Sequence, residues 1–214
     1  MKDRRKVTER MEYDKASLTE EDAGSDPMQL FGSWLEEARA AQAPDHNAMM
    51  LATAGSASIS CRVVLLRSFD GDGFVFHTNY NSRKAMDLER DARVALTFFW
   101  PQLQRQVRIE GKAEFATKEE SDAYFAERPR ESRISAWSSD QSRLVDGRAA
   151  MEERFRRWKE RFDGGEVPRP DHWGGVRVRP VRMEFWQGRA NRMHDRLVYE
   201  RFGDGSWQRM RLQP

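Results

Sequence analysis

The alternation of apolar and polar positions is clearest between residues 105 and 115. The apolar or small residues fall on every second position, at Val107, Ile109, Gly111, Ala113 and Phe115. Polar and charged residues occupy the positions between them, and Gln106 is the first of these. A period of two is typical of a β-strand with one face buried. We therefore expect a strand here, with Gln106 near one end of its polar face, where it can meet a ligand or simply solvent.

Other apolar runs predict an antiparallel meander. They lie at 48–53, 59–67, 74–76, 93–100, 176–187, 195–202 and 206–212. DGDG at 70–73 and GDG at 203–205 tolerate turn conformations, so each predicts a hairpin. The first of these hairpins would join the strand at 59–67 directly to the strand at 74–76. The strand at 48–53 is expected to be the antiparallel neighbour of the strand at 59–67.

Helical spacing appears in three longer segments. Residues 26–42 open with Asp-Pro, an N-cap followed by proline at the first helical position, and continue with apolar residues on one face. Residues 117–127 open with a capping-box pattern and stop before a proline. A helix after residue 147 carries an apolar stripe that we expect to belong to the core: Met151, Phe155, Trp158 and Phe162.

A short helix is predicted after the breaker cluster at 79–82. Ser82 can cap a helix that runs to Leu88 and begins with Arg83 and Lys84. The free backbone N–H groups of a helix start and two cations favour the same negative charge, so this corner suits a phosphate. The alternative is that Arg83 and Lys84 are ordinary solvated surface charges.

A second group of anion-binding side chains follows the capping box. Tyr124 and Arg128 are four residues apart and share a helix face. Ser132 comes just beyond them, in the sequence RPRES. A phenol, a guanidinium and a hydroxyl at this spacing can converge on one anion.

Composition limits the classes of function. The 38% hydrophobic content and seven tryptophans describe a globular protein, and a net charge of +2 does not favour non-specific nucleic-acid binding. No run approaches the roughly 18 apolar residues of a membrane span. The four histidines lack the spacing of a metal site, so no metal is expected. One cysteine, Cys61, fits a reducing, cytoplasmic location, and we expect it to be buried.

The order of elements predicts the fold class and the domains. Residues 1–25 are charged and poor in apolar side chains, so we expect a mobile segment there. Residues 26–214 are expected to form one domain. Strands clustered in the middle and at the end, with helices inserted between them, predict an α+β fold built on a small antiparallel barrel with packed helices.

Six motifs together resemble one family. They are RVVLLR at 62–67, HTNYNSRK at 77–84, RQVRIEG at 105–111, YFAERPRES at 124–132, QS at 141–142 and EFWQGRANRMHDR at 184–196. In this order and spacing they resemble the pyridoxine/pyridoxamine 5′-phosphate oxidases. The resemblance implies an FMN-binding split barrel that forms a homodimer with FMN at the subunit interface. It also implies oxidation of the C4′ alcohol or amine of vitamin B6 phosphates by dioxygen to pyridoxal 5′-phosphate, releasing hydrogen peroxide and, from the amine, ammonia.

The resemblance also assigns the FMN site. The residues expected along the cofactor from one subunit are Arg62, Val63, Val64, Leu65, Leu66, Arg67, His77, Thr78, Arg83, Lys84 and Gln106. Those expected from the partner subunit are Gln141, Ser142, Trp186 and Arg196. Within this set the FMN phosphate and ribityl contacts fall on Arg62, Arg83 and Lys84. The phosphate corner inferred from helix capping thus coincides with the one that the resemblance implies.

The substrate site is implied in the same way. The phosphate pocket falls on Tyr124, Arg128, Ser132 and Arg67, the catalytic pair over the pyridine ring on Arg192 and His194, and a lid on Arg10 to Tyr13. Two positions depart from the family pattern. Arg67 stands where a lysine is usual, which keeps the charge but changes its geometry. Met11 stands where an arginine is common, which bears on the lid contacts.

Three other functions remain as alternatives. A related split-barrel flavin oxidase of the phenazine pathway is also similar near both ends of the chain, but a substrate without phosphate would not need the pocket around Arg128. A non-catalytic carrier of B6 phosphates would share the binding residues without turnover. An arginine-rich RNA-binding module is disfavoured by the near-neutral charge and the lack of an aromatic RNA-binding signature.

Overall fold

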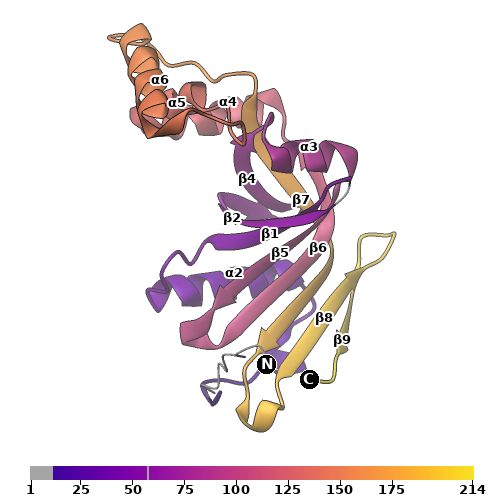
Figure 1. Cartoon of the computed structure of the whole chain (residues 1–214). Coiled ribbons are helices and arrows are strands. Elements are labelled where there is room, and N and C mark those ends of the chain that lie inside the picture. The colour runs from indigo at the N-terminus through magenta and orange to yellow at the C-terminus, as the bar shows by residue number, and fades with distance from the viewer. Residues whose placement is uncertain (1–11, 57) are drawn as a thin grey trace, which may run out of the picture. The chain divides into compact units, whose positions relative to one another are not determined.

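The computed structural model describes residues 12–56 and 58–214 (Figure 1). The lid contacts expected of Arg10, and the effect of Met11, therefore lie outside the described residues. Residues 12–25 are described and include a helix, while the mobility expected of residues 1–25 stays a prediction. The chain forms two compact units. The first contains the described residues up to His46 with Phe99–Arg108 and Met183–Pro214, and the second contains Asn47–Phe98 and Ile109–Arg182.

The second unit is built on an antiparallel sheet. Its strands are β1 Ala48–Ala54, β2 Ile59–Leu65, β3 Ser68–Asp70, β4 Gly73–Asn79, β5 Arg93–Trp100, β6 Arg105–Phe115 and β7 Trp173–Gln187, the last three of which also enter the first unit. They are hydrogen-bonded in the order β2-β1-β5-β6-β7-β4-β3. The predicted pairing of β1 with β2 is confirmed, and so is the alternation along β6, where Val107 and Ile109 are buried.

The hairpin before β4 differs from the prediction. Asp70 and Gly73 do form its turn, but they join β4 to the short strand β3. β2 ends at Leu65 and pairs with β1. The Leu66 amide bonds the Asn47 carbonyl (2.9 Å) and the next amide, of Arg67, bonds Val75 (2.8 Å). The chain thus changes partner strand at this point, which a continuous apolar run does not reveal.

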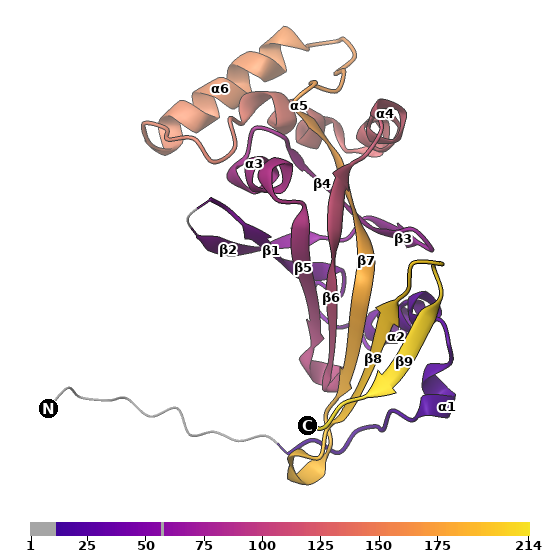
Figure 2. The ribbon, with the colours of Figure 1, turned by 90° about the vertical axis from the view of Figure 1, so that its right-hand side faces the viewer.

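Helices of the second unit gather at one end of β4 and β7 (Figures 1 and 2). They are α4 Lys118–Glu127, α5 Arg130–Ser138 and α6 Gly147–Arg161, and α3 Arg83–Arg90 follows β4. The capping box of α4 is confirmed, since the Thr117 hydroxyl accepts from the Glu120 amide (3.1 Å). Helix α5 was not predicted, because Pro129 reads as an interruption although proline also suits the residue before a helix.

The prediction that the apolar stripe of α6 belongs to the core is wrong. No residue of α6 is buried in the described chain, and Met151 is 52% exposed. Helix α6 packs through a few rings, with the Trp158 ring 4.9 Å and the Phe162 ring 5.6 Å from Trp137 of α5. The stripe therefore shows which side of the helix is apolar, but one flanking helix covers only part of it.

The first unit combines a helix with the chain's C-terminal hairpin. Its elements are α1 Glu20–Ala23, α2 Pro27–Ala40, the short 3-10 helices η1 Pro101–Leu103 and η2 Ala190–Arg192, and strands β8 Asp195–Arg201 and β9 Trp207–Arg211. The start of α2 is confirmed, because the Asp26 carboxylate accepts from the Met28 amide (2.8 Å). Figure 2 shows α1 beside β9, where Glu20 forms an ion pair with Arg211 (2.7 Å).

The expectation for Cys61 is wrong, since its side chain is exposed. It lies on the outward face of β2 with Ile59 and Val63, which are 80% and 64% exposed. β2 is at the end of the strand order of this sheet. Among the described helices, none has the length and apolar character that crossing a membrane requires.

Candidate functional site

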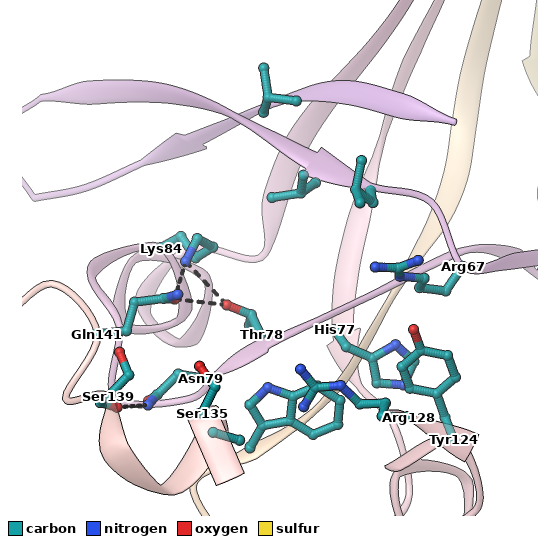
Figure 3. A pocket seen from close by; sticks show the side chains of 15 residues that line it. Arg67, His77, Thr78, Asn79, Lys84, Tyr124, Arg128, Ser135, Ser139 and Gln141 are labelled. Carbon is teal, nitrogen blue, oxygen red and sulfur yellow. Dashed lines mark hydrogen bonds between the residues drawn. The ribbon is translucent and has the colours of Figure 1, made fainter. Parts of the chain in front are cut away.

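A cavity of about 340 Å³ lies in the second unit, between β2, β4 and the helices α4 and α5 (Figure 3). Its lining residues are Val63, Val64, Leu65, Arg67, His77, Thr78, Asn79, Lys84, Tyr124, Arg128, Ser135, Ala136, Ser139, Gln141 and Trp173. Most of these had been predicted. Three are cationic, and no Asp or Glu is among the described residues that line the cavity. Because the charged side chains that line the cavity are positive, the cavity favours an anionic ligand.

Lys84 defines one end of the cavity. Its ammonium donates to the Thr78 hydroxyl (3.1 Å), the Ser82 hydroxyl (3.2 Å) and the Gln141 side-chain oxygen (2.6 Å), as Figure 3 shows for Thr78 and Gln141. Burial and then the charge of Arg62 lower the pKa of Lys84 to about 8. No carboxylate is among these partners, so a bound phosphate would supply the missing counter-charge.

Arg62 and Arg83 do not join Lys84 in lining this cavity. Arg62 donates to the Thr53 hydroxyl (2.8 Å) and to the Leu51 carbonyl (3.2 Å), and burial lowers the pKa of its guanidinium. Arg83 donates to the exposed Ser58 hydroxyl (2.9 Å). Their contact with an FMN phosphate stays a prediction, although Arg62 acts on the cavity through its effect on Lys84.

Parallel rings form the other end of the cavity. The His77 ring lies 3.9 Å from Tyr124 and 5.2 Å from Trp173, and these pairs are stacked with interplanar angles of 21° and 17°. The Arg128 guanidinium lies over the Trp173 ring at 4.3 Å, and that of Arg67 lies 6.0 Å from the Tyr124 ring. The structure thus brings together Tyr124, Arg128 and Arg67, as predicted, on an aromatic wall.

Two buried polar atoms at this end have no hydrogen-bond partner among the described residues, Nδ1 of His77 and Nη1 of Arg128. Burial, followed by the charges of Arg67 and Arg128, lowers the pKa of His77 to about 4, so its ring is neutral at pH 7. A buried donor without a partner costs about 1–3 kcal/mol, and more for a charged group. A ligand oxygen at this end would accept a hydrogen bond from Nη1 of Arg128, and from Nδ1 of His77 in the tautomer that carries its proton there, so the wall suits a polar, anionic group.

Ser132, Gln141 and Ser142 differ in how they relate to the cavity. Ser132 does not line it, whereas Ser135, one turn further along α5, and Ser139, the residue after the helix, do. Gln141 of this chain contacts Lys84 directly, and its expected origin in the partner subunit stays a prediction. Ser142 is exposed, with a φ of 72°, and lines a separate hollow beside α6.

Several lining residues were missed by sequence reasoning: Asn79, Ser135, Ala136, Ser139 and Trp173. The serines were missed together with helix α5. Asn79 stood in the breaker cluster, where an amide reads as turn chemistry. It does accept from the Asn81 amide (2.8 Å), but it also donates to the Ser139 carbonyl (3.1 Å). Trp173 precedes a glycine pair that reads as a turn, and its place in the wall comes from its pairing with Asn79 on β4.

A second group of predicted residues lies in the first unit. Tyr13, Trp186 and His194 form a ring cluster in which Tyr13 meets both partners edge-on at 5.7 Å and Trp186 lies 4.7 Å from His194. Nδ1 of His194 accepts a hydrogen bond from the Arg189 amide (3.0 Å). Burial and then the Arg192 charge lower the pKa of His194. Its neutral imidazole therefore carries the proton on Nε2 and presents a donor there.

Three further predicted residues belong to this unit. Arg192 is exposed and has a φ of 62°, a left-handed conformation that is costly for a residue with a side chain. Arg196 bonds the buried Glu184 carboxylate (2.8 Å) and the Gln213 carbonyl (2.9 Å). Gln106 is half-buried on β6. The described residues contain no cluster of His, Cys, Asp or Glu that could hold a metal ion.

Known families match most of the chain. Residues 35–162 match the pyridoxamine 5′-phosphate oxidase family, and residues 173–214 match the C-terminal dimerisation region of pyridoxine 5′-phosphate oxidase. Curated relatives named pyridoxine/pyridoxamine 5′-phosphate oxidase include those of Rubrobacter xylanophilus (54% identical) and Cupriavidus metallidurans (50%). The matches cover 96% of this chain and 94% and 97% of the two relatives.

Solved structures share the fold. PhzG from Burkholderia lata, solved in complex with tetrahydrophenazine-1-carboxylic acid, is 32% identical and superposes with a TM-score of 0.88, over 94% of this chain and 99% of that one. A pyridoxamine 5′-phosphate oxidase-related, FMN-binding protein from Nostoc punctiforme is 15% identical, with a TM-score of 0.71 over 88% of this chain and 98% of that one. The second likeness concerns the fold alone.

Proposed function

Because this chain belongs to the pyridoxamine 5′-phosphate oxidase family, we propose that it oxidises pyridoxine 5′-phosphate or pyridoxamine 5′-phosphate with dioxygen to pyridoxal 5′-phosphate, using FMN as its cofactor. The fold is the α+β split barrel of that family. The observation that carries the proposal is the cavity with cations at both ends and no carboxylate among the described residues that line it. One end suits the phosphate of the cofactor and the other that of the substrate.

The residues at the Lys84 end fit FMN. Lys84, Thr78 and Gln141 already form a hydrogen-bonded group that can turn its donors to a phosphate. Val63 and Leu65 supply an apolar wall of the kind that a flavin ring packs against. When bound, FMN supplies the acceptor for the hydride that leaves C4′, and its reoxidation by dioxygen gives hydrogen peroxide.

The residues at the aromatic end would hold the substrate by its phosphate. Arg128 has one buried N–H group without a hydrogen-bond partner in the described part of the chain, and Arg67 lies close enough to share the same anion. Anchoring the phosphate at a fixed place removes the freedom of the pyridine ring relative to the acceptor. Orientation of this kind contributes much of the rate in reactions between two bound partners.

His194 and Arg192 would act on the pyridine end of the substrate. Because Nδ1 of His194 accepts from the Arg189 amide, its Nε2–H is free to donate to a ring substituent. The lowered pKa keeps the imidazole neutral at pH 7, so His194 orients the substrate by a hydrogen bond. Arg192 adds a positive charge beside it that can stabilise negative charge on the heteroatom as the C4′ amine or alcohol loses its proton.

The alternative with specific support is oxidation of a phenazine-type substrate, since PhzG is 32% identical and very similar in fold. That ligand is a carboxylic acid, so a cationic cavity alone does not separate the two. The pairing of two anion-binding ends in one cavity, with Arg128 and Tyr124 at the second, favours a phosphorylated substrate. Curated relatives of 46–54% identity also carry the B6 phosphate name.

Purified protein tests the proposal directly. Its visible spectrum should show flavin at about one per subunit, and aerobic incubation with pyridoxamine 5′-phosphate should release hydrogen peroxide and ammonia. Incubation with a dihydrophenazine carboxylic acid is the comparison. Turnover of the phenazine acid without turnover of either B6 phosphate would overturn the proposal. Flavin and B6 phosphate binding without peroxide would make the protein a carrier.

The subunit assembly and the cellular location are inferred from less specific observations. The match to the dimerisation region indicates a homodimer. We place FMN at the interface of the two subunits, in keeping with the family resemblance. The single, unpaired cysteine fits a reducing compartment, so we place the protein in the cytoplasm.

A further inference from the structure

We propose that Gln104 and Gly188 form a dock for residues 12–15, which positions Tyr13 against His194 for the oxidation. Gln104 would then be a positioning residue, since it acts on the substrate through Tyr13. The inference rests on the proposed function for its kinetic consequence but not for the dock itself. All of the residues concerned lie in the first unit.

Gln104 holds the backbone of the segment through its side chain. Its Oε1 accepts from the amides of Asp14 (3.0 Å) and Lys15 (3.2 Å). Its Nε2 donates to the Glu12 carbonyl (3.3 Å). Gln104 is only 3% exposed, so these bonds are shielded from water. One amide side chain thus satisfies three backbone groups of this segment, at Glu12, Asp14 and Lys15.

The backbone of Gln104 ties the same position to the end of β7. Its carbonyl accepts from the Gly188 amide (2.8 Å) and from the Gln187 side chain (3.3 Å). The φ of Gln104 is 55°, a left-handed conformation at the end of η1. This conformation is uncommon for a residue with a side chain and persists where the surroundings hold it. Gln104 therefore connects segment 12–15 with the strand that carries Trp186.

Gly188 provides the surface on which the Tyr13 ring lies. A Cβ atom at position 188 would come within 2.9 Å of Cγ and 3.0 Å of Cβ of Tyr13. These atoms lie next to the Tyr13 backbone, so a rotation of the side chain cannot relieve the steric contact. The whole residue would have to move. The ring lies 5.7 Å from both His194 and Trp186. A displaced Tyr13 would thus leave the imidazole that we assign to substrate orientation.

The test compares two variants of Gln104. Gln104→Met keeps an unbranched side chain of similar size but removes the acceptor and the donor. Gln104→Glu is the comparison variant, because its carboxylate still accepts from the Asp14 and Lys15 amides while only the donor to the Glu12 carbonyl is lost. Gly188→Ala disturbs the dock independently, by steric contact with Tyr13. Hydrogen exchange of the Asp14 and Lys15 amides, flavin content, KM and kcat are measured for each, and circular dichroism checks the fold.

In Gln104→Met we expect the two amides to lose protection and the KM for pyridoxamine 5′-phosphate to rise roughly tenfold, the equivalent of one or two lost hydrogen bonds. Flavin content should stay at the wild-type level, and kcat should fall by less than the change in KM. Gln104→Glu should keep amide protection. Gly188→Ala should raise KM while leaving the two amides more protected than in Gln104→Met.

Unchanged protection of both amides in folded Gln104→Met would overturn the dock. If the two amides lose protection in Gln104→Met but the KM is unchanged both there and in Gly188→Ala, the positioning role is overturned. Should Gln104→Met fail to fold, Gly188→Ala decides the positioning role by the same KM measurement, and Gln104→Ala, which also removes the acceptor and the donor, decides the dock by amide protection. If wild-type protein does not turn over B6 phosphates, the proposed function is wrong, and hydrogen exchange still decides the dock.

Discussion

Arg128 lies on an aromatic surface, 4.3 Å above the Trp173 ring and 5.6 Å from the Phe125 ring. One of its N–H groups is buried and has no partner among residues 12–56 and 58–214, and burial lowers the pKa of the guanidinium. An unsatisfied cation in a cavity is costly unless a ligand completes it. The residue is therefore organised for a bound anion, and the aromatic rings fix its direction without neutralising its charge.

The first prediction concerns this side chain. Arg128→Ala should raise the KM for pyridoxine 5′-phosphate by roughly 10- to 150-fold, because a charge-assisted hydrogen bond contributes about 1.5–3 kcal/mol. Flavin content should not change, since Lys84 at the other end of the cavity is untouched. Steady-state kinetics and the flavin spectrum measure the two effects separately. Arg39→Ala is the control, at a side chain 69% exposed on α2. A KM at the wild-type value would show that the substrate phosphate binds elsewhere.

Arg67 shows how far a single residue can be interpreted. The family pattern has lysine at this position, and a prediction from sequence could say only that the charge is kept. The structure places its guanidinium 6.0 Å from the Tyr124 ring, where a planar group can stack and still reach an anion. We predict that Arg67→Lys changes the KM for either B6 phosphate less than Arg128→Ala does, as measured by the same kinetics. A larger effect at Arg67 would make it the main phosphate ligand.

At the scale of elements, helix α3 sets the charge of Lys84. The first turn of the helix places Lys84 beside Thr78 and Gln141, where burial and then the nearby charge of Arg62 lower the pKa of Lys84 to about 8. In the free protein, Lys84 therefore loses its proton at a pH only slightly above neutral. A phosphate monoester is a dianion above its second pKa of about 6, so it would stabilise the protonated form of Lys84.

FMN affinity should therefore fall as pH rises. Above about pH 8 the free protein has lost the Lys84 proton, and binding the dianion must take one up, so the Kd for FMN should increase toward roughly tenfold per pH unit. Quenching of flavin fluorescence, on titration of flavin-free protein, measures this from about pH 6.5 to about pH 9.5. Lys84→Arg keeps its charge over that range and should show a flatter curve. An equal slope in both proteins would exclude Lys84 as the titrating group.

Local patterns predicted most elements of the fold. β5, β6, α2 and the capping box of α4 follow from periodicity and end signals in their own residues. The errors concern which elements pack against or pair with one another. An apolar stripe indicates that α6 has an apolar side but does not say that only part of it is covered, and a continuous run does not show that β2 and β3 pair with different strands.

The candidate site was predicted unevenly for the same reason. Lys84, Thr78, Tyr124 and Arg128 were found because motif spacing identifies them, and the structure brings all four to one cavity. Trp173 was missed, because its position opposite Asn79 depends on the register of β7 with β4. Pairing register of that kind is a long-range property that no local pattern contains.

On the scale of the whole molecule, the predicted site residues fall into two groups. Lys84, Arg67 and Arg128 line a cavity in the second unit, while Trp186, His194 and Arg196 belong to the first. The family resemblance assigns Trp186 and Arg196 to the partner subunit of each site. A homodimer with its sites at the interface would then carry two copies of the site, each drawing on both chains.

Mixed dimers test this arrangement. We predict that Lys84→Glu and Arg196→Gln proteins, each nearly inactive alone, recover activity when they are co-expressed, because a mixed dimer has one site with both lesions and one with neither. Gln is chosen because Arg196 bonds the buried Glu184, where a second carboxylate would be repelled. Random pairing makes half of the dimers mixed with one intact site each, so activity should approach about a quarter of wild type. Two affinity tags isolate the mixed dimers, and wild-type chains carrying the same tags are the control. Mixed dimers no more active than their parents would mean that each site is built within one chain.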